Sequence, residues 1–104
     1  MAENILVNEL RTVFDKNDCQ IIDVREVFEY QAVRIPNSKL VPLSEFEEKI
    51  IEINKNQPAY FLCGIGKRAQ KAAEYLESKG YSNLFVIEGG IKAWIEAGYP
   101  TESG

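Results

Sequence analysis

Short apolar runs alternate along this chain with stretches in which apolar residues recur every three or four positions. The runs have the length of buried strands, and the stretches between them have the periodicity of amphipathic helices. Strands that alternate with helices favour a mainly parallel central sheet with helices on both faces. The sequence therefore predicts an α/β fold. The expected strands are 5–7, 21–24, 40–41, 59–62 and 84–87.

Helices are expected in the segments between these runs. Asn8 has the residue type of an N-cap, and Ser44 with Glu47 has the spacing of a capping box. Gly80 is expected to end the helix before it, and Trp94 is expected to face the core. The expected helices lie near 9–14, 26–32, 44–53, 69–76 and 91–95.

The length of 104 residues suits one domain over 1–104, with a core over about 5–101. The net charge of −4 argues against a nucleic-acid surface, which needs clustered Lys and Arg. The apolar runs are too short to span a bilayer, so no membrane contact is expected. The start of the chain does not have the pattern of a secretory signal, and the expected compartment is the cytoplasm.

Histidine is absent from the chain, which limits the chemistry it can perform. Ser-His-Asp and Cys-His catalysis are excluded, and so is any metal site that contains histidine. Two cysteines cannot by themselves complete a structural zinc site. The sequence therefore indicates neither a metal nor another cofactor.

The strongest candidate site is the loop between the run at 59–62 and the helix that follows it. Cys63 lies at the expected carboxyl end of a strand, where parallel sheets place their ligand crevices. Helix-terminal amides, glycine flexibility and two cations should hold an anion there and favour a thiolate at neutral pH. The alternative is an inert Cys63 that ends a core strand. The loop residues are Cys63, Gly64, Ile65, Gly66, Lys67 and Arg68.

The loop resembles the Cys-x-x-Gly-x-Arg active-site loop of the rhodanese family, through Cys63, Gly66 and Arg68. Three further segments are similar to the family in the same order, so the resemblance covers nearly the whole chain. These are Asp23-Val24-Arg25-Glu26 with Glu29-Tyr30, Val41-Pro42-Leu43, and 87–91 with Ala93-Trp94 and 97–100. The chain differs from the usual sequence of the family in two places. Residues 33–38 replace the usual Gly-His-Ile-Pro-Gly-Ala, and Gly64 stands where Arg is frequent.

The resemblance implies a rhodanese-like fold and a sulfurtransferase. Cys63 would take a sulfane sulfur from thiosulfate, a persulfide or a polysulfide, and pass it to cyanide or a thiol. The implied partners are these small donors and acceptors, and a sulfur-relay protein. A thiolate that attacks sulfur needs no general base, and the loop amides can hold the charge of a persulfide. Gly64, Ile65, Gly66, Lys67 and Arg68 are the expected substrate-binding residues.

Arg25 is a further candidate for substrate binding, because it follows a strand that ends at the same edge of the sheet as Cys63. The alternative is a surface ion pair with Glu26 or Glu29. Asp23 lies within a buried strand and is expected to hydrogen-bond neighbouring loops. Glycines 89 and 90 are expected to let the backbone pass close to the Cys63 loop.

Cys19 is expected near the opposite edge of the sheet. Five strand residues at roughly 3.3 Å each separate this edge from the edge where Cys63 lies, a distance of about 16 Å. A disulfide needs Cα atoms within roughly 7 Å, so Cys19 should not act as a resolving thiol.

Two other functions remain open. A Cys-dependent phosphatase or arsenate reductase also uses a Cys-to-Arg anion loop, but with five intervening residues where this chain has four. The shorter loop suits a sulfur atom better than a tetrahedral phosphate. The second alternative is a non-catalytic interaction module, because a fold does not determine its function.

Overall fold

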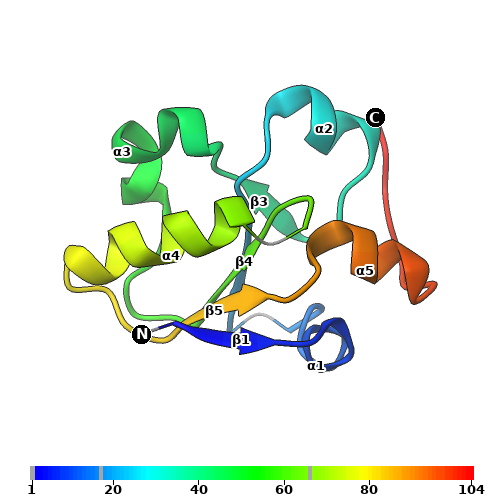
Figure 1. Cartoon of the computed structure of the whole chain (residues 1–104), viewed down its shortest axis with the longest axis horizontal. Coiled ribbons are helices and arrows are strands. Elements are labelled where there is room, and N and C mark those ends of the chain that lie inside the picture. Colours follow the sequence, from blue (N-terminus) through cyan, green and yellow to red (C-terminus); the bar gives the residue numbers. More distant parts are fainter. Residues whose placement is uncertain (1, 17, 66) are drawn as a thin grey trace.

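The computed structural model describes residues 2–16, 18–65 and 67–104. Within these residues all neighbouring strands pair in parallel, in the order β1-β5-β4-β2-β3 (Figure 1). The α/β fold with a parallel sheet is therefore confirmed. The strands are β1 (Glu3–Ile5), β2 (Gln20–Asp23), β3 (Ser38–Leu40), β4 (Ala59–Leu62) and β5 (Leu84–Ile87).

Helices connect the strands, and short 3-10 turns flank one of them. None of the helices in the described ranges combines the length and apolar character needed to cross a bilayer. The helical elements are α1 (Val7–Arg11), α2 (Val27–Ala32), η1 (Leu43–Glu45), α3 (Phe46–Lys49), η2 (Ile50–Glu52), α4 (Lys67–Ser78) and α5 (Gly90–Glu96).

The core has two parts, one on each face of the sheet. Successive strand residues point to opposite faces, so Ile21 packs in the cluster that contains Trp94 of α5, and Ile22 in the cluster that contains Leu76 of α4. Figure 1 shows α3 and α4 on one side of the sheet and α1 on the other. Burial of both faces explains why the strands are continuous apolar runs.

Two predicted helix caps are wrong. Asn8 lies inside α1, and Leu6 is the N-cap, where its N–H donates to Glu9 Oε1 at 3.1 Å. The chain therefore leaves β1 two residues earlier than the apolar run indicated. Ser44 forms no cap, because its hydroxyl donates to the carboxylate of Glu26, the residue just before α2. Leu6 caps α1 through a contact three residues along the chain, whereas Ser44 lies inside η1 and contacts a residue far from it in sequence.

The C-terminal half follows its prediction more closely. Gly80 has a φ of +88° just after α4, and Tyr81 N–H donates to the carbonyl of Leu76 at 3.0 Å, as expected for a glycine helix stop. Trp94 is fully buried, and its indole N–H donates to the Pro100 carbonyl at 2.7 Å. Ile95 was expected on the same face but is 45% exposed, since α5 rests on the core along a narrower stripe.

Candidate active site

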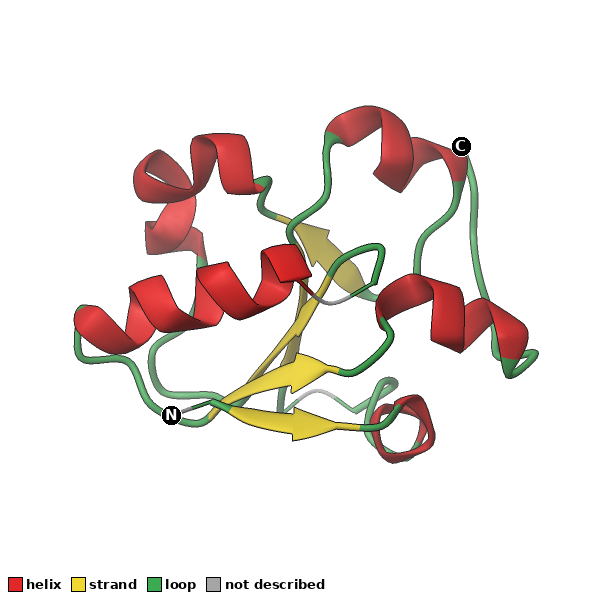
Figure 2. Ribbon diagram, in the orientation of Figure 1, coloured by secondary structure: helices red, strands yellow, loops and turns green. Residues whose placement is uncertain are grey.

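The loop that contains Cys63 leaves β4 at the carboxyl edge of the sheet and enters α4. β4 lies between β5 and β2, so the segments that follow those two strands flank the loop. Figure 2 shows the loop beside the first turn of α5. Gly66, one of the predicted loop residues, lies outside the described residues.

The sulfur of Cys63 lies against the first turn of α4. The backbone N–H of Ala69 donates to Cys63 Sγ at 3.4 Å. Cys63 is only 1% exposed and packs with the core residues on the α4 face. The sulfur atom is therefore shielded from water and lies beside a backbone N–H at the N-terminus of a helix, a position where a donor can offset negative charge on sulfur.

Gly90 brings α5 into direct contact with the loop. Ile91 N–H donates to the Cys63 carbonyl at 2.8 Å, and Lys92 N–H donates to the Gly64 carbonyl at 3.3 Å. A Cβ at Gly90 would collide with the Cys63 carbonyl oxygen and would lie 2.6 Å from that of Gly64. The predicted close backbone approach is confirmed at Gly90, which also has a φ of +61°.

Arg68 is held by a carboxylate from α2. Its Nη1 donates to Glu29 Oε1 at 2.8 Å and its Nη2 to Glu29 Oε2 at 3.0 Å, a bidentate ion pair. The hydrogen bonds from Arg68 hold the pKa of Glu29 at about 2, below its ordinary value of 4.5. A Cβ at Gly64 would lie 3.3 Å from Arg68 Nη2, so the guanidinium lies close over the loop backbone.

Sequence reasoning did not identify Glu29 as the partner of Arg68. The sequence suggested Glu29 as a surface partner for Arg25 and as part of a segment that resembles the family. The available signal was its position, because Glu29 follows a strand that ends at the same edge of the sheet as β4.

Arg25 lies in a buried ion pair with Asp23 rather than at the surface. Its Nε and Nη2 donate to the two oxygens of Asp23 at 2.9 and 2.8 Å, and Nη2 also donates to the Val33 carbonyl at 2.6 Å. The side chains of Arg25 and Asp23 are 4% and 0% exposed. The alternative of a surface pair with Glu26 or Glu29 is wrong in both partner and burial. Asp23 ties the loop after β2 to its strand, as expected.

Ile65 and Lys67 are exposed on the outer side of the loop. Both line a pocket of about 250 Å³ together with Glu88 and Gly89 from the segment after β5. This pocket is therefore contiguous with the Cys63 loop.

Cys19 lies at the other edge of the sheet. It precedes Gln20, which pairs with Ala59 at the start of β4, while Cys63 follows the end of β4. Its thiol donates to the Val13 carbonyl at 3.4 Å, and burial raises its pKa. Neither cysteine is in a disulfide, and the predicted separation of Cys19 from Cys63 is confirmed by the strand register.

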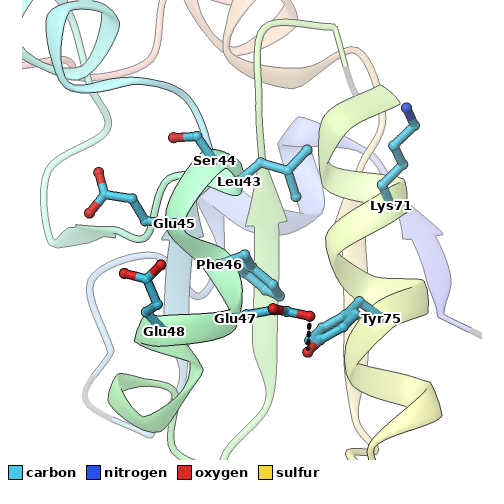
Figure 3. Close-up of a pocket in the computed structure, with 8 residues that line it drawn as sticks. All are labelled: Leu43, Ser44, Glu45, Phe46, Glu47, Glu48, Lys71 and Tyr75. Atoms are coloured by element: carbon cyan, nitrogen blue, oxygen red, sulfur yellow. Dashed lines mark hydrogen bonds between the residues drawn. The ribbon is translucent and has the colours of Figure 1, made fainter.

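A larger pocket of about 470 Å³ lies between the η1–α3 segment and α4 (Figure 3). Phe46 and Tyr75 line it, and the Tyr75 hydroxyl donates to Glu47 at 3.3 Å. None of its lining residues is a predicted site residue. The candidate site is therefore the smaller pocket and the Cys63 loop.

Comparison with protein families gives one domain match. Residues 6–97 match the rhodanese-like domain, which confirms the resemblance read from the sequence. The chain is 34% identical over 74 residues to "Putative sulfur carrier protein YrkF" of Bacillus subtilis, covering 71% of this chain and 40% of that protein. It is 32% identical over 97 residues to thiosulfate sulfurtransferase GlpE of Pseudoalteromonas translucida, covering 93% and 91%.

A solved structure supports the same grouping. The crystal structure of a rhodanese-related protein from Thermoplasma volcanium superposes with a TM-score of 0.89 at 33% identity, covering 98% of this chain and 99% of that one. The strand order and the position of the Cys63 loop therefore belong to a fold shared with that protein.

Proposed function

Since this chain belongs to the rhodanese-like domain family, we propose that it is a sulfurtransferase that carries sulfane sulfur as a persulfide on Cys63. The observation that carries the proposal is the Ala69 N–H, which donates to Cys63 Sγ at 3.4 Å from the first turn of α4. An amide in that place can stabilise the negative charge that Sγ carries when Cys63 attacks the donor and again when Cys63 leaves from the persulfide.

In the first half-reaction the Cys63 thiolate attacks the outer sulfur of the donor. A new S–S bond forms, and the bond that held the outer sulfur breaks with its electron pair on the leaving group. Sulfite leaves from thiosulfate, and a thiolate leaves from an alkyl persulfide. No external oxidant, reductant or general base is required.

In the second half-reaction an acceptor attacks the outer sulfur of the Cys63 persulfide, and the Cys63 thiolate leaves. Cyanide gives thiocyanate, and a thiolate gives a new persulfide. A role in a sulfur relay is supported by the printed name of the Bacillus subtilis relative, although this chain spans 40% of that protein. Substrate binding by Gly64, Ile65, Lys67 and Arg68 is supported by the pocket that Ile65 and Lys67 line and by the guanidinium of Arg68, which lies close to the Gly64 backbone.

Intact-mass measurement tests the proposal. Incubation with thiosulfate or polysulfide should add about 32 Da per sulfur atom, and dithiothreitol should remove it, because thiolate–sulfur exchange is reversible. Cys63→Ser should lose the added mass, and Cys19→Ser is the matched control that should keep it. Equal loss in both variants, or retention in Cys63→Ser, would contradict the assignment of Cys63.

A further inference from the structure

The cations around the Cys63 loop are each accompanied by a carboxylate. Arg68 is the cation closest to the loop backbone, and Glu29 engages both of its terminal nitrogens at 2.8 and 3.0 Å. The side chains of Arg68 and Glu29 are 38% and 25% exposed, so water screens the pair only in part. This pair brings no net charge to the loop.

The other two cations beside the loop, Lys67 and Lys92, also have an acid near them. Lys67 and Glu88 line the same pocket of about 250 Å³. Lys92, whose backbone N–H donates to the Gly64 carbonyl, has its Nζ 4.0 Å from Glu96. Each of these cations therefore has an acid in its neighbourhood, and Arg25 at the same edge of the sheet is likewise paired with Asp23.

The charge of the sulfur donor determines how strongly this pairing of cations with acids affects the reaction at Cys63. Thiosulfate carries two negative charges, and the attacking Cys63 thiolate carries a third. A cationic surround would offset this repulsion, but here Glu29 and Glu88 cancel the charges of Arg68 and Lys67. An alkyl persulfide brings one negative charge or none, so it meets less repulsion at the same site.

We propose that Glu29 and Glu88 are specificity-determining residues that make this site prefer alkyl persulfides to thiosulfate as sulfur donors. The proposal rests on the proposed sulfurtransferase function and names its donor class. Glu29 acts by neutralising Arg68, to which it is bound, and Glu88 acts by offsetting the charge of Lys67 in the pocket that both residues line. Because Arg68 holds the pKa of Glu29 at about 2, that carboxylate stays charged at every pH at which the protein would work.

The test compares two donors on the intact protein. The rate constant for adding one sulfur to Cys63 is measured by mass spectrometry with thiosulfate and with 2-hydroxyethyl persulfide. In water, one charge removed at roughly 10 Å changes the rate by about twofold for each charge on the donor. At low salt, and for a persulfide that carries one negative charge, Glu29→Gln and Glu88→Gln should each raise the thiosulfate-to-persulfide ratio about twofold, and the double variant about fourfold.

Two features of the design separate charge from loop structure. Gln at position 29 can still accept a hydrogen bond from Arg68, and Glu88 is exposed, so its replacement disturbs no packing. Glu45→Gln removes the same charge from the ion pair that Glu45 of η1 forms with Lys49 of α3, and it should leave the ratio unchanged. The effect of the two test variants should shrink as salt rises, since the screening length falls from about 10 Å at 0.1 M to about 3 Å at 1 M.

The outcomes distinguish the inference from the proposed function. If the wild type accepts sulfur on Cys63 but the donor ratio stays unchanged or falls in the double variant, the specificity role is overturned and sulfur transfer stands. If no donor adds sulfur to Cys63, the proposed function itself fails.

Discussion

Gly90→Ala should destabilise the protein and damage the Cys63 loop together. Gly90 has a φ of +61°, and its missing Cβ leaves room for the Cys63 and Gly64 carbonyl groups of the loop. Both carbonyls also accept hydrogen bonds from α5. An added methyl group therefore pushes the loop away from the helix that holds it.

The size of the effect has two sources. A non-glycine residue in the left-handed region costs about 1–2 kcal/mol. The collision adds about 1–3 kcal/mol, typical of an overpacked interior, because a Cβ would lie 2.6 Å from the Gly64 carbonyl oxygen and 2.7 Å from its carbonyl carbon. The total is about 2–5 kcal/mol, and each kcal/mol lowers Tm by roughly 4–8 °C in a domain of this size.

Gly98→Ala is the matched control. Gly98 has a φ of +79° but no atom within 4 Å of the position of an added Cβ. It should therefore lose only the conformational part, about 1–2 kcal/mol, and keep its sulfur loading. Urea denaturation gives the two free energies of unfolding, and intact mass after thiosulfate gives the loading of Cys63. A Gly90→Ala protein as stable as Gly98→Ala, with normal loading, would refute the reasoning.

Two further predictions concern ion pairs at the carboxyl edge of the sheet. The folded pKa of Glu29, about 2, lies below its ordinary 4.5; the stability it contributes is therefore present above pH 4.5 and lost as pH falls toward 2. Denaturation across this window should show a weaker loss in Glu29→Gln than in the wild type, and identical pH slopes would contradict the ion pair. Arg25→Ala should cost about 3–5 kcal/mol in urea denaturation, because it leaves Asp23 buried without its cation. A stable Arg25→Ala protein with a raised KM for its donor would instead support the substrate-binding prediction.

Much of the fold could be predicted from local patterns. The runs at 59–62 and 84–87 are strands as predicted, and the apolar spacing at 69–76 marks the buried face of α4. These elements bury long apolar stretches, so their own periodicity determines them. Short elements were predicted less well. α1 begins after Leu6, two residues before the predicted cap. Ser44 was expected to cap a helix, but it lies inside η1 and donates to Glu26, a contact that the sequence pattern does not indicate.

Part of the candidate site could also be predicted from local sequence patterns. Cys63 could be found because its neighbours in sequence, a buried run before it and an amphipathic helix after it, place it at a strand-to-helix junction. The role of Gly90 was accessible for the same reason, since two glycines follow a strand at the same edge.

The sequence by itself determined the α/β alternation, the position of Cys63 and the family resemblance, because all three depend on residues adjacent in the chain. Only the tertiary structure decided which carboxylate meets which cation. Arg68 and Glu29 are 39 residues apart, and several acids were equivalent candidates for Arg25 and Arg68 in sequence. An ion pair forms where packing brings two side chains within about 3–4 Å, and the parallel sheet does this by gathering the ends of separate strands at one edge.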